Sequence, residues 1–208
     1  MSFRRFPSFA RRAARTSAQG RRVLITGGAR SGKSQLAEEM LASRLEVVYL
    51  ATGAVPTAGD LEWSARVAAH QARRPVSWTT VETADAAAVL ATETSMPGTA
   101  RAVLFDCVGT WLTAAMDASG LWAAAEAGAE AVSAADTALA RSEDRLVAAW
   151  SATKTDVVAV TNEVGSGVVP ATVSGRRFRD ELGRLNTRLA SVADEVWLCT
   201  AGIPLRIR

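Results

Sequence analysis

The sequence predicts an α/β fold in which a mostly parallel sheet carries helices on both faces. Short apolar runs recur along the chain, and longer alanine-rich amphipathic segments separate them. This alternation is typical of βαβ units, whose parallel strands are buried on both sides. Sheet strands are expected at residues 22–26, 46–50, 102–106, 156–160 and 195–199.

The remaining segments supply the helices and one edge of the sheet. Helices are expected at residues 34–44, 61–73, 84–94, 121–152 and 175–192. The 121–152 segment contains Gly128 and could form two helices. Residues 203–208 follow the last apolar run after the turn residues Ala201 and Gly202, which predicts an antiparallel C-terminal edge strand.

Length and composition favour one folded domain behind a basic extension. A chain of 208 residues, 49% of them hydrophobic, can bury one sizeable core, so residues 22–208 are expected to form a single domain. Residues 1–21 show no apolar period and predict a disordered extension. Their arginines and serines, without any acidic residue, also resemble an organelle transit peptide, and this alternative stays open.

The charge balance and the cysteines argue against several classes of protein. Seven of the 24 basic residues fall within residues 1–22, so the other 17 face 21 acidic residues and the folded part is weakly acidic. A nucleic-acid partner is therefore not expected, because such binding needs a basic face. No apolar run reaches the roughly 18 residues of a membrane span. Cys107 and Cys199 lie within apolar runs and are expected to be free thiols, as in a cytoplasmic protein.

One segment, GGARSGKS, fits the phosphate-binding pattern G-x-x-x-x-G-K-[ST]. It follows the first predicted strand and precedes the first predicted helix. The glycines let backbone amides turn toward phosphate oxygens, the helix directs its positive end at them, and Lys33 reaches the outer phosphates. A P-loop NTPase-like nucleotide site is therefore favoured over a plain glycine-rich turn. Its residues are Gly27, Gly28, Ala29, Arg30, Ser31, Gly32, Lys33 and Ser34.

Two residues are candidate magnesium ligands. Ser34 ends the phosphate-binding segment, where a hydroxyl ligates Mg²⁺ in such loops. Asp106 ends a predicted strand, the position from which an acid holds Mg²⁺ through water. Many strands end in an acid, so this assignment depends on the phosphate loop being present.

His70 is the only histidine of the chain. A lone histidine is more often a packed or solvent-facing residue, yet a neutral imidazole is also a nucleophile that can attack phosphorus. The nearby Arg73 and Arg74 could hold phosphates or could form a solvated helix face. The residues alone leave both interpretations open.

Several segments together resemble one enzyme family. After the phosphate loop come YLATG (49–53), RVAAHQARRPVSWTTVE (66–82), LFDCVGTWLT (104–113), VTNEVGSGVVP (160–170) and RRFRDELGRLNTRLASVADEVWL (176–198). In this order they are similar to the adenosylcobinamide kinase / adenosylcobinamide-phosphate guanylyltransferase family. The resemblance runs from about residue 22 to the C-terminus.

The resemblance implies a bifunctional enzyme of cobalamin (vitamin B12) biosynthesis. Such an enzyme phosphorylates the aminopropanol hydroxyl of adenosylcobinamide with ATP or GTP. It then transfers GMP from GTP onto that phosphate, which gives adenosylcobinamide-GDP and pyrophosphate. In the family the transfer passes through a GMP-histidine intermediate, and the matching residue is His70. The resemblance also implies a corrinoid substrate and a homotrimer with active sites between subunits.

The family's nucleotide contacts carry over to positions beyond the phosphate loop. They match Ala51, Thr52, Gly53, Arg73, Arg74, Glu82 and Asp106. The stretch QARRP after the histidine lacks the Lys-Asp-Gly run of some members, which favours Arg74 as a contact over Gln71 and Ala72. Asp106 stands where some members have glutamate, which keeps the charge and shortens its reach. The loop NEVGSGVVP lies near the active site in the family, and a structural turn is the alternative.

Two other functions compete with this interpretation. In the first, the chain is a single-activity P-loop kinase of a small molecule, and His70 is only structural. In the second, it is a nucleotide-dependent switch or nucleic-acid module that uses the arginine-rich extension. The second predicts salt-sensitive DNA or RNA binding that is lost when residues 1–20 are deleted.

Overall fold

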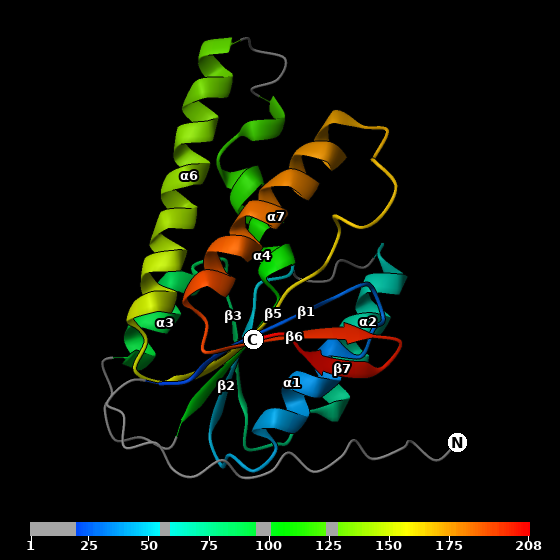
Figure 1. The fold of residues 1–208 in the computed structure, drawn as a ribbon, viewed down its shortest axis with the longest axis vertical. Coiled ribbons are helices and arrows are strands. Elements are labelled where there is room, and N and C mark those ends of the chain that lie inside the picture. The colour runs from blue at the N-terminus through cyan, green and yellow to red at the C-terminus, as the bar shows by residue number, and fades with distance from the viewer. Residues whose placement is uncertain (1–19, 55–58, 95–100, 124–128) are drawn as a thin grey trace.

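A seven-stranded sheet forms the centre of the computed structural model, which describes residues 20–54, 59–94, 101–123 and 129–208 (Figure 1). The strands are β1 (Arg22–Gly27), β2 (Val47–Ala51), β3 (Thr79–Glu82), β4 (Ala102–Asp106), β5 (Asp156–Val160), β6 (Glu195–Thr200) and β7 (Ile203–Arg206). Their order is β3-β2-β4-β5-β1-β6-β7, and all pairs are parallel except the antiparallel β6–β7 pair. The predicted sheet and its antiparallel C-terminal edge strand are confirmed.

Helices cover both faces of this sheet (Figure 1). They are α1 (Lys33–Leu41), α2 (Leu61–Arg73), α3 (Ala86–Thr94), α4 (Val108–Ala118), α6 (Ala129–Ala152) and α7 (Val173–Val192). One face packs against α3, α4, α6 and α7, and the other packs against α1, with α2 beside it. Helices α6 and α7 extend beyond the sheet as a two-helix projection (Figure 1).

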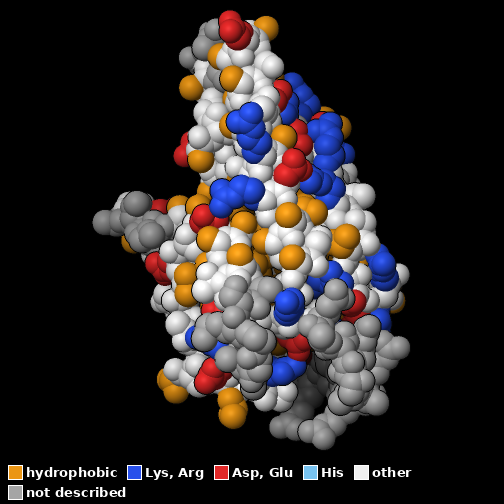
Figure 2. Space-filling model, turned by 90° about the vertical axis from the view of Figure 1, so that its left-hand side faces the viewer, with side chains coloured by type: hydrophobic (Ala, Val, Ile, Leu, Met, Phe, Trp, Pro, Cys, Tyr) orange, Lys and Arg blue, Asp and Glu red, His pale blue; other side chains and the backbone are white. Residues whose placement is uncertain are grey.

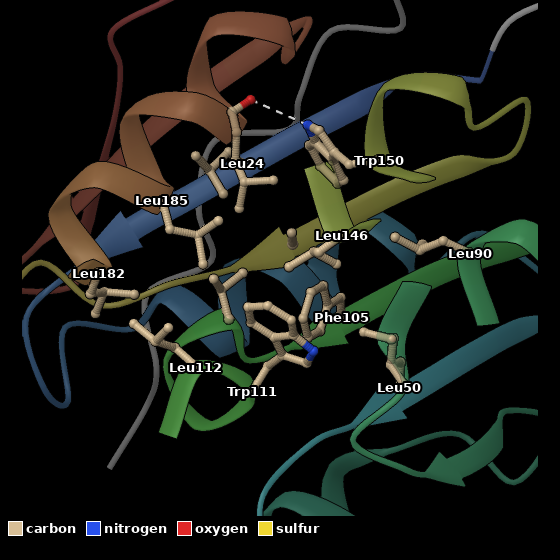
Figure 3. Close-up of a cluster of buried hydrophobic side chains, with 14 of the residues drawn as sticks. Leu24, Leu50, Leu90, Phe105, Trp111, Leu112, Leu146, Trp150, Leu182 and Leu185 are labelled. Carbon is tan, nitrogen blue, oxygen red and sulfur yellow. Dashed lines mark hydrogen bonds between the residues drawn. The ribbon is translucent and has the colours of Figure 1, made fainter. Parts of the chain in front are cut away.

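The larger core lies between the sheet and the four-helix face. Figure 3 shows Leu24 of β1 and Phe105 of β4 facing Leu146 and Trp150 of α6. The buried indole of Trp150 donates a hydrogen bond to the Leu189 carbonyl at 3.2 Å (Figure 3). An unpaired buried N–H is costly, so the structure retains this hydrogen bond. Since the bond joins α6 to α7, it also helps to fix how the two helices pack.

Two elements were not anticipated from the sequence. Strand β3 is mostly exposed at the sheet edge, and its residues TTVE lack the apolar run that marks a buried strand. Helix α4 begins within VGT, a poor helix-forming stretch, but it buries Trp111, Leu112 and Met116 in the core. Both elements form because tertiary contacts outweigh local preference.

Parts of two predicted segments lie outside the described residues. Residues 121–123 are helical and α6 begins at Ala129, while Gly128, where a break was considered, lies outside the described part. The same holds for residues 1–19 of the predicted extension. Arg21 is described: its main-chain N–H donates to Asp156 Oδ1 at 2.8 Å and its guanidinium lies 2.7 Å from Glu195 Oε2. The folded part therefore includes Arg21.

Charges of both signs are intermingled on the face drawn in Figure 2. Along the projecting helices, Arg177 pairs with Asp136, and Arg188 pairs with Glu143 and Asp144. Within the described ranges, none of the helices is long and apolar enough to cross a membrane.

Candidate active site

The predicted phosphate loop connects β1 to α1 at the carboxyl end of the sheet. Gly32, the residue before the helix, has a φ of 93°, a left-handed conformation that glycine adopts without penalty. Lys33 begins α1, is 6% exposed, and donates from Nζ to the Gly28 carbonyl at 2.9 Å. The lysine side chain therefore lies along the loop that it is predicted to serve.

Three later segments of the chain hold this loop in place. The Gly202 N–H, in the turn between β6 and β7, donates to the Ser31 carbonyl at 3.1 Å. The Glu163 N–H, after β5, donates to the Gly27 carbonyl at 3.0 Å. Gly27 is also paired in register with Cys199 of β6. These backbone contacts fix the position of the loop at the edge of the sheet.

The predicted acidic residues meet because their strands end at the same edge. Ala51, the last residue of β2, pairs in register with Glu82 of β3 on one side and Asp106 of β4 on the other. Parallel strands place their carboxyl ends together, which is the edge where open α/β sheets bind ligands. The structure thus brings Ala51, Glu82 and Asp106 to one row, beside the phosphate loop.

Helix α2 supplies one wall of the site. Its residues Trp63, Val67 and His70, together with Arg74 directly after the helix, recur at helical spacing and line the same pocket. His70 Nδ1 lies 3.7 Å from Asp106 Oδ2. The imidazole therefore reaches the row of acids across the pocket.

Tyr49 lies behind this contact. Its hydroxyl donates to Asp106 Oδ2 at 2.9 Å, and the guanidinium carbon of Arg74 lies 3.3 Å from the centre of its ring. Burial and then the Asp106 charge raise the pKa of Tyr49 above its ordinary value, so the hydroxyl stays protonated as a donor. Arg74 also donates from Nη1 to Thr80 Oγ1 at 3.1 Å.

These groups surround a pocket of about 230 Å³. The predicted residues that line it are Lys33, Ser34, Ala51, Gly53, His70, Arg74, Glu82 and Asp106. This volume is below the ~300–1,000 Å³ of a typical small-molecule site, so it would hold part of a nucleotide but not a corrinoid.

Other predicted residues surround the pocket without lining it. Thr52 is buried and donates to the Cys107 carbonyl at 2.9 Å, which ties its loop to the start of α4. Arg73 turns away and forms two hydrogen bonds to Glu38 of α1, at 3.0 and 3.1 Å. The phosphate loop contributes Lys33 and Ser34, while its residues 27–32 are outside the lining.

Several lining residues were not selected from the sequence. They are Tyr49, Ala54, Trp63, Val67, Gln71, Cys107, Thr110 and Asn162. The helical spacing of Trp63 and Val67 to His70 could have indicated the first two of these on α2. Tyr49 sits inside an apolar strand run and offers no such signal. Glu163, in the loop NEVGSGVVP, accepts from the Gly165 and Ser166 N–H groups through Oε1, as in a local turn.

A phosphate loop in this setting, at the carboxyl end of a parallel sheet, places the chain among P-loop nucleotide-binding proteins. The comparison with known families is more specific. The model of the CobU family, described as cobinamide kinase / cobinamide phosphate guanyltransferase, matches residues 23–207, and the chain belongs to this family.

Curated relatives agree with this membership along nearly their whole length. The bifunctional adenosylcobalamin biosynthesis protein CobU of Salmonella typhimurium is 39% identical over 190 residues, covering 89% of this chain and 99% of the relative. The Escherichia coli protein of the same name is 39% identical over 186 residues, with the same coverage. The bifunctional protein CobP of Pseudomonas aeruginosa is 36% identical over 188 residues, covering 90% and 97%.

A solved structure, the P4 protein from bacteriophage phi6 in complex with ADP, shares 18% identity at a TM-score of 0.40. The match covers 97% of this chain and 60% of that one. So distant a likeness adds nothing to the description of the site.

Proposed function

We propose that this chain carries out both reactions of its family at one pocket. It phosphorylates the aminopropanol hydroxyl of adenosylcobinamide with ATP or GTP, then transfers GMP from GTP to the new phosphate. The products are adenosylcobinamide-GDP and pyrophosphate. Family membership over residues 23–207 supports the reaction pair, and the matches to the two CobU relatives cover 99% of each relative.

The observation that carries the proposal is that Lys33 and His70 line the same pocket. Phosphoryl transfer to a hydroxyl needs no nucleophile from the protein, whereas nucleotidyl transfer through a covalent intermediate needs one beside the α-phosphate. His70 fits this second need because its imidazole lies at the pocket wall, half-buried, with Asp106 behind it.

The first reaction transfers a phosphoryl group. The substrate hydroxyl oxygen forms a bond to the γ-phosphorus as the bond from that phosphorus to the β,γ-bridging oxygen breaks. The nucleoside diphosphate leaves with the electron pair of the broken bond, and the hydroxyl proton passes to water. Lys33 and the amides of the phosphate loop stabilise the negative charge that spreads over the phosphate oxygens.

The second reaction passes through His70. Its Nε2 lone pair forms a P–N bond to the α-phosphorus of GTP while the bond to pyrophosphate breaks, and pyrophosphate leaves with the electron pair. A phosphate oxygen of adenosylcobinamide phosphate then forms a bond to the same phosphorus, and Nε2 recovers its lone pair. Two steps spare the protein from aligning two polyanions at once. Arg74, at the same wall, offsets the phosphate charge.

Magnesium fits the oxygen donors of the pocket. Within the described residues, no group of three or more His, Cys, Asp or Glu could form an all-protein cage. Mg²⁺ at phosphates is instead held by one or two protein oxygens and the substrate, and Ser34 and Asp106 both line the pocket. Bound there, Mg²⁺ would neutralise phosphate charge.

The remaining assignments complete the proposal. Ala51, Gly53 and Glu82 contribute to binding the nucleotide, since they line the pocket at the carboxyl ends of β2 and β3. The corrinoid lies mostly outside the pocket, because the cavity is too small for it. A homotrimer with active sites between subunits, as the family resemblance implies, would supply the additional surface.

The decisive experiment uses His70→Ala and GTP labelled at the α-phosphorus. Wild-type protein should acquire an acid-labile, base-stable label, and His70→Ala should acquire none while it still phosphorylates adenosylcobinamide. Lys154→Ala, at the other lysine of the chain and far along the sequence from the loop, is the matched control for handling and folding. Label retained in His70→Ala would place the nucleophile elsewhere. A wild-type protein that phosphorylates but takes no label would support the single-activity kinase.

A further inference from the structure

The contact between Tyr49 and Asp106 has no role in the two reactions as written above. Tyr49 pairs in register with Leu104, and Ala51 with Asp106, so the tyrosine and the aspartate lie two positions apart on neighbouring parallel strands. Side chains two positions apart share one face of a sheet. The phenol therefore runs along that face toward the end of β4 and meets the carboxylate there.

The position of the tyrosine hydroxyl is determined by packing. Tyr49 is 2% exposed, and Arg74 lies over its ring. Arg74 is itself bound to Thr80 of β3. A buried aromatic ring with a cation stacked on it has little freedom to rotate, and its hydroxyl is a fixed donor for Asp106 Oδ2.

The same carboxylate oxygen faces the imidazole. Asp106 Oδ2 accepts from Tyr49 at 2.9 Å and lies 3.7 Å from His70 Nδ1. The second distance exceeds that of a hydrogen bond, and contacts of catalytic groups are commonly longer before substrate binds. Nδ1 is the imidazole nitrogen that lies near this carboxylate.

The orientation of this carboxylate matters for a histidine nucleophile. A neutral imidazole has one N–H and one lone pair, and the partner of one nitrogen decides which atom keeps the lone pair. If Nδ1–H donates to Asp106, Nε2 carries the lone pair. A carboxylate that is free to turn holds this tautomer less well.

We propose that Tyr49 is a positioning residue for GMP transfer, because its hydroxyl orients Asp106 and the aspartate keeps the proton on Nδ1 of His70. The inference rests on the proposed transfer through His70. In the step itself, Nε2 forms the P–N bond, pyrophosphate departs with the electrons of the broken P–O bond, and the proton stays on Nδ1 facing Asp106.

Tyr49→Phe tests this directly because it removes one oxygen and keeps the ring beneath Arg74. His70 is the only histidine, so the ¹⁵N spectrum of histidine-labelled protein reports on one imidazole and shows its tautomer. The measurement is made at a pH where the ring is neutral. Ser142→Ala, which removes a hydroxyl hydrogen bond to Ala138 within α6, is the matched control and should leave the imidazole signals unchanged.

Tyr49→Phe is expected to reduce the fraction of the Nδ1–H tautomer and to slow formation of the GMP-protein by about tenfold, the scale of losing a group that orients an active-site histidine. The KM for GTP should change by less than about twofold, because the hydroxyl orients the nucleophile and does not bind nucleotide. Circular dichroism and a melting curve check that the variant is folded.

Unchanged tautomer fractions in folded Tyr49→Phe would overturn the inference, whether or not labelling becomes slower. A change in the tautomer fractions without slower labelling would also overturn it. A different outcome would contradict the proposed function itself, namely that wild-type protein takes no label from GTP. The imidazole spectra of wild type and Tyr49→Phe would still show whether Tyr49 orients His70.

Discussion

Gly27 and Cys199 approach so closely that no side chain fits between them. A β-carbon added to Gly27 would lie 2.5 Å from the Cys199 carbonyl oxygen and 2.6 Å from Ser31 Oγ. The two residues pair in register at the ends of β1 and β6. The first glycine of the phosphate loop is thus required by its neighbours in the sheet.

We expect Gly27→Ala to destabilise the protein by about 1–3 kcal/mol, the usual cost of overpacking a close contact. Chemical denaturation measures this free energy of unfolding. Gly28→Ala is the matched control for stability, because nothing lies within 4 Å of its added β-carbon. Equal stability of the two variants would show that the sheet ends relax more easily than the geometry indicates.

Lys33→Ala should lower both phosphorylation of adenosylcobinamide and GMP transfer by at least about a hundredfold, the scale of losing one donor to developing charge. Both reactions need triphosphates held in the same loop. Product formation from adenosylcobinamide with ATP and with GTP measures the two activities. The exposed Lys154, mutated in the same way, should retain both. Strong GMP transfer by Lys33→Ala would mean that the reactions use separate nucleotide sites.

Asp106→Asn should raise the magnesium concentration needed for half-maximal phosphorylation by about tenfold, since one ligand charge is lost with almost no change in volume. A magnesium titration of kinase activity measures the shift. Asp85→Asn, at a surface pair with Arg145, controls for the loss of a charge outside the pocket. Identical titrations for wild type and Asp106→Asn would rule out the metal role of Asp106.

Glu143 predicts a pH dependence of stability. Burial, and then the Glu181 charge, raise the pKa of Glu143 from 4.5 to about 7, while Arg188 opposes the shift. At a pH between these two pKa values, Glu143 is therefore protonated in the folded state and ionised in the unfolded state. The contribution of Glu143 to stability is greatest below pH 4.5 and is lost as the pH rises toward 7.

We expect the free energy of unfolding to fall by on the order of 2 kcal/mol more in wild type than in Glu143→Gln between pH 5 and pH 8, at about 1.4 kcal/mol per pKa unit. Denaturation curves at several pH values measure the difference. Glu130→Gln, at the exposed start of the same helix, should follow the wild type. Parallel profiles for wild type and Glu143→Gln would contradict the raised pKa.

The N-terminal boundary can be tested with two deletions. Removal of residues 1–19 should leave the melting temperature unchanged, because that stretch has no apolar period. Removal of residues 1–21 also deletes the contacts of Arg21 with Asp156 and Glu195. At about 1 kcal/mol per hydrogen bond, it should lower the melting temperature by a few degrees. A lower melting temperature in the shorter deletion would show that residues 1–19 pack.

Much of the fold could be predicted from local sequence patterns. The buried runs at 22–26, 102–106 and 156–160 identify central strands because parallel strands between two helical layers must be apolar on both faces. The phosphate loop can be predicted for a similar reason, since its glycines and Lys33 lie within one segment of eight residues. The order of the segments that resemble the family then predicted the two reactions, through that resemblance.

Other features depend on residues far apart in the chain. Strand β3 and helix α4 were not predicted, because tertiary contacts with other elements stabilise them and their own composition does not. Arg73 and Arg74 are adjacent in the sequence, yet Arg73 binds Glu38 on α1 while Arg74 stacks on Tyr49. Nothing in the pair itself distinguishes these directions, because the packing of α2 against α1 and β2 decides them.

The sequence by itself therefore determined the central strands of the sheet, the phosphate loop and, through the resemblance, the family, because each of these depends on short contiguous segments. Only the tertiary structure decided that His70 faces Asp106 and that Tyr49 stands behind both. These side chains come from α2, β4 and β2, and they meet because parallel register places the ends of β2 and β4 side by side beneath the helix. Distances between side chains on different elements follow from strand order and packing, and local sequence patterns do not predict these.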